Sequence, residues 1–258
     1  MRKILCLLSQ LFVLFISTTF GQNQKDYFGI KGGISIPNLT ANGSEQNPIN
    51  TGYSSRLGPD FAIFFEKGIT KTFSFMPSLE FSSQGGKKNG FQAFATPPEF
   101  AALFPPGNVP PYLYADYNSE AKMNYLMLGA LAKFTWPLSS KSPFSIYVDA
   151  GPFGALLLSA HQVANGSSII YADGGMQQPL TPTEQSFDNK QDIKDELHKG
   201  NFGVEGDVGF ALNIKTGKIF IEGGGNYGFL NIQKGTENGK NQTGAATIRV
   251  GYAHTMAK

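Results

Sequence analysis

The sequence predicts an all-β protein, an eight-stranded antiparallel up-and-down transmembrane β-barrel with short periplasmic turns and long outer loops. Three observations predict this fold. The chain is rich in glycine and aromatic residues, with 31 Gly and 22 Phe among 258 residues, and only 16% of its residues are charged. Segments in which apolar and polar residues alternate recur along the chain, as in strands with two different faces. The connections between these segments alternate between long and short, as in outer-membrane barrels.

The N-terminus has the pattern of a signal peptide. Arg2 and Lys3 precede an apolar run over residues 4–16, and small and polar residues follow over residues 17–21. The run is too short for a spanning helix, and Thr19 and Gly21 suit the small-residue positions before a cleavage site. We therefore expect a signal peptide over residues 1–21 and an outer-membrane barrel domain over residues 22–258.

Removal of residues 1–21 changes the charge and the cysteine content. Lys+Arg falls from 21 to 19, which equals the 19 Asp+Glu, and the single Cys is lost. A neutral chain has no electrostatic footprint for nucleic acid, so no nucleic-acid partner is expected. An exported chain without thiols fits an oxidising cell envelope.

Eight segments have the period-two alternation of strands and are bounded by turn-forming residues. In order, they are residues 27–36, 60–69, 72–83, 122–135, 144–157, 201–214, 218–229 and 244–254. The long connections cover residues 37–59, 84–121, 158–200 and 230–243, and the short ones cover 70–71, 136–143 and 215–217. An even number of strands places both ends of the domain on the periplasmic side.

Each strand has an apolar face and a polar face. The apolar face points outward in a membrane barrel and inward in a soluble one, and the pattern alone does not assign the side of each strand. Charges lie mid-strand beside glycines such as Gly129 and Gly209, which suits a narrow interior filled with ion pairs. Trp136, Tyr227 and Tyr252 lie near strand ends, where interfacial aromatic belts form. These observations favour a membrane barrel over a soluble ligand-binding barrel.

Eight charged residues of the polar face form the predicted barrel-interior charge network. A closed eight-stranded barrel is just wide enough to be filled by its side chains, and buried charges need partners. We expect the network to plug the interior, with Asp60 and Glu66 as further candidates. The alternative is a cation-preferring path, because the acids outnumber the bases. The network residues are Lys31, Glu80, Lys133, Asp149, Glu205, Asp207, Glu222 and Arg249.

The long connection over residues 84–121 is the candidate binding region. It interleaves aromatic residues with prolines, and rigid aromatic side chains on loops often contact ligands or partners. The alternative is self-packing, in which the rings cap the barrel mouth. Pro97 is predicted to open a short helix over residues 99–103. The candidate residues are Phe91, Phe94, Phe100, Phe104, Tyr112, Tyr114 and Tyr117.

The connection over residues 158–200 is predicted to contain a surface helix. Ser186 or Asp188 would cap it, and it would run through Ile193 and Leu197 to Gly200.

No catalytic, cofactor or metal site is predicted. Glu205 and Asp207 share a strand face, but nothing around them marks a catalytic cleft. Residues 223–228 match the glycine spacing of a dinucleotide-binding loop, but they continue as a strand and not as the required helix. The three histidines lack the spacing of metal ligands. We therefore expect no enzyme and no cofactor.

Four segments resemble the outer-membrane β-barrel family of Bacteroidota that is often labelled porin-like. Residues 73–85 read Phe-Ser-Phe-Met-Pro-Ser-Leu-Glu-Phe-Ser-Ser-Gln-Gly and resemble the third strand of that family. Residues 29–35, 125–133 and 226–232 are similar to its first, fourth and seventh strands. The similarity runs in order over nearly all of residues 27–254, although Met127 and Gly129 stand where the family has Glu and Pro.

The resemblance implies an eight-stranded, non-enzymatic barrel in the outer membrane of a Gram-negative bacterium, in contact with outer-membrane lipid. It also implies help from periplasmic chaperones and the barrel-assembly machinery during biogenesis. We expect the outer loops to contact an extracellular ligand, a protein partner or a surface. The first alternative is a narrow porin-like passive channel for small solutes. An outer-membrane enzyme is a weaker alternative, because it would need a catalytic cluster at the barrel mouth.

Overall fold

The computed structural model describes residues 24–41, 46–235 and 239–256, and the predicted signal peptide lies outside these ranges. Eight long antiparallel strands close into a ring in the order β1-β2-β3-β6-β7-β11-β12-β13. The predicted up-and-down barrel is therefore confirmed. The ring strands are β1 (Tyr27–Ala41), β2 (Gly58–Gly68), β3 (Phe73–Lys88), β6 (Asn118–Pro137), β7 (Phe144–Asn165), β11 (Gly200–Ile214), β12 (Gly217–Gly228) and β13 (Asn241–Thr255).

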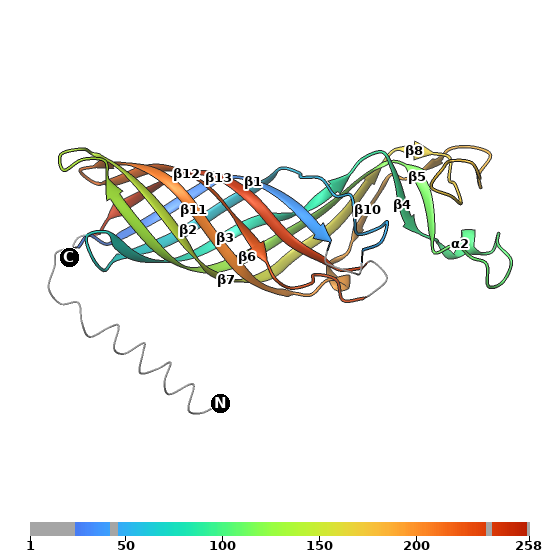
Figure 1. Cartoon of the computed structure of the whole chain (residues 1–258), viewed down its shortest axis with the longest axis horizontal. Helices are drawn as coiled ribbons and strands as arrows, with labels where there is room; N and C mark the ends of the chain where they lie inside the picture. Colours follow the sequence, from blue (N-terminus) through green and yellow to red (C-terminus); the bar gives the residue numbers. More distant parts are fainter. Residues whose placement is uncertain (1–23, 42–45, 236–238, 257–258) are drawn as a thin grey trace, which may run out of the picture.

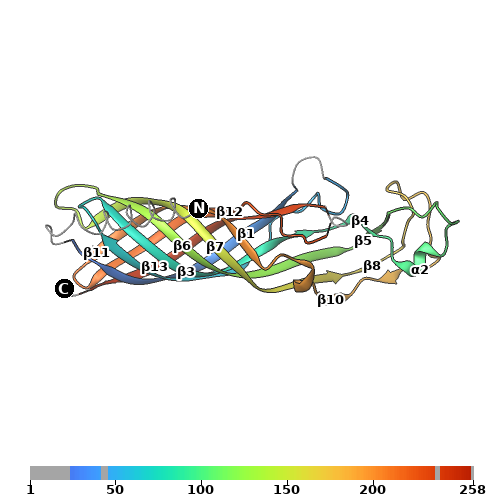
Figure 2. The same ribbon diagram turned by 90° about the horizontal axis from the view of Figure 1, so that it is seen from below.

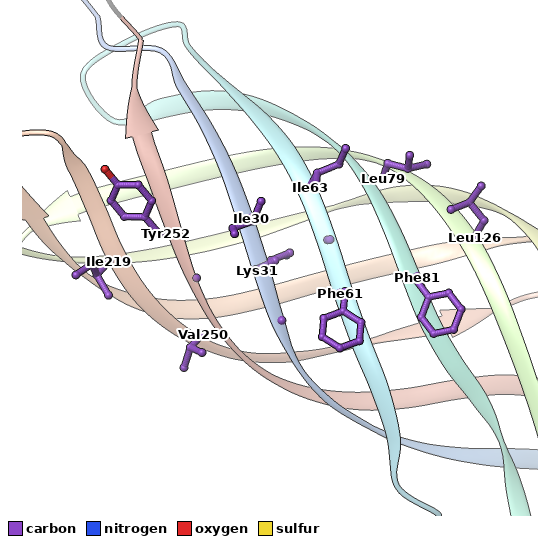
Figure 3. Close-up of a pocket in the computed structure, with 13 residues that line it drawn as sticks. Ile30, Lys31, Phe61, Ile63, Leu79, Phe81, Leu126, Ile219, Val250 and Tyr252 are labelled. Atoms are coloured by element: carbon purple, nitrogen blue, oxygen red, sulfur yellow. The ribbon is translucent and has the colours of Figure 1, made fainter.

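The apolar side chains of the wall point outward. Ile30 is 57% exposed, Phe61 56% and Val250 59%, whereas the neighbouring positions on the same strands are buried, except for the half-buried Gly251. The close-up in Figure 3 shows these residues on the outer surface of β1, β2 and β13, where they line a shallow depression of about 700 Å³. An apolar outer band is what the hydrocarbon core of a bilayer requires. No helix in the described ranges is both long and apolar enough to cross a membrane.

The two ends of the barrel differ. The turns after β2, β6 and β11 are short and lie at the end where β1 begins and β13 stops (Figure 1). At the other end, β3, β6 and β7 continue past the ring as an extension that we call the outer blade, visible in both views (Figures 1 and 2). The blade also contains β4 (Phe91–Ala95), β5 (Tyr112–Asp116), β8 (Ser167–Ser168), β9 (Gln185–Ser186) and β10 (Asn189–Asp192).

The blade corrects three predicted strand boundaries. Strand β3 was predicted to end at 83, β6 to begin at 122 and β7 to end at 157, but they pair out to Lys88, Asn118 and Asn165. Paired strands satisfy the backbone groups that an irregular loop would have left to solvent. A buried core of its own supports the blade, with Leu113 and Ala115 fully inaccessible and Ile170 nearly so.

The two helix predictions have different outcomes. A short helix after Pro97 is confirmed as α2 (Pro98–Ala101). The predicted helix from Ser186 or Asp188 to Gly200 is wrong, because this segment forms β10 and then a 3-10 helix, η2 (Lys194–Glu196). Strand β10 pairs with the outer end of β7, and the Asp188 carboxylate accepts a hydrogen bond from the Gly166 N–H instead of capping a helix.

Candidate functional site

Arg249 on β13 lies in the barrel interior and contacts four carboxylates. Its Nε is 2.9 Å from Glu222 Oε1, and its Nη1 is 2.7 Å from Glu80 Oε2 and 3.2 Å from Asp60 Oδ1. Its Nη2 donates to Asp207 Oδ2. The four acids belong to β12, β3, β2 and β11, so one guanidinium group connects strands across the bore.

Glu222 also accepts hydrogen bonds from two other side chains. Lys31 Nζ lies 2.8 Å from its Oε1, and the Tyr147 hydroxyl donates to its Oε2 at 2.6 Å. The Tyr147 ring packs directly over Gly209, where a Cβ atom would come within 2.0 Å of the ring. Glycine at 209 therefore makes room for the ring that holds Glu222.

A second charged layer lies nearer to the end with the short turns. Lys218 Nζ is 2.7 Å from both oxygens of Glu66, and Lys133 Nζ is 3.3 Å from one of them. Lys133 Nζ lies 3.7 Å from the centroid of the Tyr147 ring, and Lys218 Nζ lies 4.1 Å from that of Tyr27. These cation–π contacts stabilise the two buried ammonium groups inside the barrel.

Carboxylates outnumber cations in these layers. Seven buried acids face four buried bases, and neither oxygen of Asp149 has a hydrogen-bond partner in the described part of the chain. Glu205 lies over Gly129, where a Cβ atom would come within 2.1 Å of its Oε1. The bore thus has a net excess of acidic groups. The seven acids are Asp60, Glu66, Glu80, Asp149, Glu205, Asp207 and Glu222, and the four bases are Lys31, Lys133, Lys218 and Arg249.

Three of these carboxylates gather closely enough to bind a cation. Oxygens of Asp149, Asp207 and Glu222 lie within 4.8 Å of one another. The Lys31 ammonium is 2.8 Å from Glu222 and 3.6 Å from Asp207. The protein's own ammonium group therefore already lies beside two of the three possible metal ligands.

An apolar cluster lies in the bore on the side of the blade. Met127, Tyr125 and Phe153 are buried there and form one cluster with Leu197 and Ile232, which come from the outer connections. Buried side chains thus occupy three levels of the bore, two charged and one apolar.

The seven aromatic residues predicted for binding have two kinds of surroundings. Phe91 stacks on Tyr114 at 5.9 Å between ring centroids, and Tyr117 stacks on Phe187 at 4.4 Å. Phe94 packs edge-on against Phe187 at 5.6 Å. Phe91 also packs edge-on against Tyr171 at 6.0 Å, so Phe91, Phe94 and Tyr117 join the segment 84–121 to the segment 158–200. The remaining three, Phe100, Phe104 and Tyr112, make no ring contact within the described ranges.

Apolar side chains are exposed at the tip of the blade. Leu103 is 61% exposed and Val109 40%, both in the segment between β4 and β5 that contains α2. Met176, in the neighbouring connection, is 51% exposed. We call residues 96–111 the blade tip.

A cavity of about 250 Å³ lies at the mouth of the barrel, below the hairpin of β4 and β5. All four long connections contribute to it, and we call it the mouth pocket. Burial raises the pKa of Tyr117 to about 12 and that of Tyr53 above its usual value, so both phenols stay neutral at physiological pH. The polar residues of the lining are Tyr53, Lys88, Gln92, Tyr117, Ser119, Gln162, Gln191, Glu196, Gln233 and Asn241.

Comparison with known families decides the class of the chain. The profile of the family described as "Outer membrane protein beta-barrel domain" matches residues 20–234. The chain belongs to this family. This outer-membrane barrel thus faces lipid with its apolar band, in a Gram-negative outer membrane.

The chain is similar to several solved structures of outer-membrane barrels. Ail, the attachment invasion locus protein of Yersinia pestis, has a TM-score of 0.38 and 10% identity, and the match covers 89% of this chain and 99% of Ail. OprG from Pseudomonas aeruginosa has a TM-score of 0.39 and 10% identity, with 93% and 100% of the two chains covered. Neisserial surface protein A has a TM-score of 0.35 and 11% identity, with 87% and 96% covered. No curated protein sequence matched the chain.

The structure of the outer-membrane barrel shows functional residues that sequence reasoning missed. Lys218 and Tyr147 were missed, although the alternation of polar and apolar residues along β12 and β7 places both side chains on the inward face. Lys218 shares the inward parity of Glu222, and Tyr147 shares that of Asp149, because residues an even number apart on a strand face the same side. The mouth pocket had no such signal, because its residues come from four separate connections.

Proposed function

We propose that this outer-membrane barrel is a non-enzymatic surface protein whose bore is closed and whose outer blade contacts a ligand, a partner or a surface outside the cell. The observation that supports this proposal is the continuation of β3, β6 and β7 beyond the apolar band. Bilayer crossing needs only about 9–11 residues per strand, whereas β6 has 20 and β7 has 22. The additional length forms the blade.

The blade has the properties of a preorganised contact surface. Its buried core and its stacked rings fix the hairpin of β4 and β5, so little conformational entropy is lost when a partner binds. Its tip exposes Leu103 and Val109 to solvent, and the neighbouring connection exposes Met176. Exposed apolar groups on a rigid support are typical of contact sites.

The route to the membrane belongs to the same proposal. We propose a signal peptide over residues 1–21 and a barrel domain over residues 22–258, with periplasmic chaperones and the barrel-assembly machinery acting during biogenesis. The resemblance to the porin-like Bacteroidota family supports that phylum as the source. The side chains proposed to close the bore are those of the predicted charge network.

A shortened hairpin tests the contact role. Ala95 pairs with Tyr112, so an Asn-Gly turn can replace residues 96–111 without changing the register. Cells displaying either form at equal levels of heat-modifiable barrel are compared for retention on gelatin, dextran and heparin coatings. We expect the shortened form to lose retention on at least one coating. Equal retention of both forms on every coating would contradict the proposal.

A narrow cation channel is the second candidate, and one observation favours it. A cavity of about 340 Å³ opens beside Glu66 and Lys218 at the end with the short turns, and the mouth pocket lies at the other end. Between them lies the acid-rich bore. Acidic rings in a bore favour cations over anions. Rearrangement of Arg249 together with the apolar cluster on the blade side would convert the two separate vestibules into a path.

A further inference from the structure

The mouth pocket brings together residues that are far apart in the sequence. Tyr53 comes from the first long connection, Gln92 and Tyr117 from the second, and Gln191 from the third, while Gln233 comes from the fourth. Convergent polar groups in a concave site are the usual sign of a small-molecule site. The pocket is separate from the blade tip, so its role is independent of the contacts proposed for the tip.

Three glutamines of the pocket are each held by their NH2 group. Gln92 Nε2 donates to the Tyr117 carbonyl at 2.6 Å, and Gln162 Nε2 donates to Ser119 Oγ at 2.6 Å. Gln191 Nε2 donates more weakly to Glu196 Oε1 at 3.4 Å. Within the described ranges, the carbonyl oxygens of these three amides accept no hydrogen bond. The short bonds fix the amides of Gln92 and Gln162, so their acceptors point to a ligand in the cavity, and the exposed amide of Gln191 adds a third acceptor at its rim.

The charges of the lining argue against an ionic ligand. Lys88 Nζ donates to the carbonyls of Pro48 and Ile49, at 2.9 and 2.8 Å, and its positive charge next to the cavity disfavours a cation. The Glu196 carboxylate and the amide carbonyls of the lining disfavour an anion, and the two opposite side-chain charges leave the lining without a net charge. Tyr53 and Tyr117 add neutral hydroxyls, which no described residue bonds, and aromatic rings. A ligand with several hydroxyl groups and no net charge satisfies this set of acceptors, donors and apolar faces.

We propose that the mouth pocket binds a neutral sugar, with the carbonyl oxygens of Gln92, Gln162 and Gln191 accepting hydrogen bonds from its hydroxyl groups. The cavity of about 250 Å³ limits the bound part to about one sugar ring. A longer glycan would extend from the mouth toward the blade. The site would then recognise one residue of an extracellular polysaccharide.

Saturation-transfer NMR tests the proposal on protein extracted from outer membranes into lauryldimethylamine oxide, a detergent without a sugar headgroup. The probes are methyl α-glucopyranoside, mannose, galactose and N-acetylglucosamine, with glucuronate and choline as charged comparators. We expect saturation transfer to at least one neutral sugar and to neither charged comparator. Q162L should weaken that binding about tenfold, because one hydrogen bond is lost. Y117F should weaken it severalfold while keeping the stack on Phe187.

Two controls make the outcome decisive. Q185L removes an exposed amide of β9 outside the pocket and should leave binding unchanged. The hairpin-shortened form should still bind the sugar, since its deletion spares every glutamine of the pocket. Absence of transfer to all four sugars, stronger transfer to glucuronate or choline, or equal losses in Q162L and Q185L would overturn the proposal. Loss of surface retention with intact sugar binding separates this site from the blade tip.

Discussion

Arg249 neutralises carboxylates that no other described cation reaches. Glu80 and Asp60 have ion pairs with Arg249 alone, whereas Glu222 also has Lys31. Removing one partner from a buried ion pair leaves an uncompensated charge, which is far more costly than losing an exposed pair. The stability of the barrel should therefore depend strongly on this one side chain.

We expect R249M to lower the free energy of unfolding by about 3–5 kcal/mol, because it leaves several buried carboxylates without their cation. K67M is the matched control, since Lys67 forms an exposed pair with Asp26 worth about 0–1 kcal/mol. Urea unfolding in detergent micelles, followed by tryptophan fluorescence, measures both. Equal midpoints for the two variants would show that Arg249 does not stabilise the bore.

Gly209 gives a second test at the residue scale. G209A should push the Tyr147 ring from its position and weaken its hydrogen bond to Glu222, at a cost of about 1–3 kcal/mol. G154A is the control, because a Cβ atom at Gly154 would meet nothing within 4 Å. The same unfolding assay compares them. An unchanged midpoint for G209A would mean that the ring moves without cost.

The blade behaves as an element with its own core, supported by three strands of the barrel. Its buried side chains lie outside the apolar band, so its stability is separable from that of the wall. Regions with separate cores open independently of the remainder of a protein. A mutation in the core of the blade should therefore unfold the blade without unfolding the barrel.

We expect L113A to unfold the blade and leave the barrel intact. Leu113 is fully buried, and a Leu→Ala change in a core costs about 2–5 kcal/mol. Trypsin should cleave the variant between residues 84 and 121, while its heat-dependent shift on gels remains. L103A, at a residue that is 61% exposed, is the control and should resist trypsin as the wild type does. Resistance of L113A would show that the blade does not depend on this core.

The sequence predicted the elements that lie in the membrane better than those of the blade. A wall strand has lipid on one face and the bore on the other, so its side chains alternate and local reading is sufficient. In β3, residues 82–86 are all buried, and the alternation disappears where the blade begins. Strand β10, with four exposed residues, has no apolar face at all. Strand β10 forms because its backbone pairs with the outer end of β7. The sequence of β10 itself has no pattern that predicts this pairing.

The whole molecule combines a lipid-facing wall, a filled bore and an outer blade. The bore is filled by ion pairs at two levels and by apolar side chains at a third. Solute passage would have to displace buried ion pairs, whose separation is costly. The closed bore that we propose therefore predicts a barrel that does not conduct.

We expect planar bilayers containing the wild-type protein to show no conductance steps at voltages below about 100 mV, because each charge gains only ~2.3 kcal/mol across that potential. The protein is delivered by fusing proteoliposomes with the bilayer, and the heat-dependent shift of protein from those proteoliposomes verifies that the barrel is folded. Salt-dependent, cation-selective steps that D149N reduces would instead favour the channel candidate.

The seam between β1 and β13 sets an order in time. β1 pairs with β13 over 15 residue pairs, from Tyr27 with Thr255 to Ala41 with Asn241. The free edge of β1, the first ring strand, is therefore paired only when β13, the last one, is in place. Contacts of such long sequence separation form late in folding. Arg249 arrives on that last strand, so the acids of β2, β3, β11 and β12 stay in water until it docks. Closure of the wall and neutralisation of the bore are consequently one event. Before β13 pairs with β1, the barrel stays open and its acidic side chains stay hydrated.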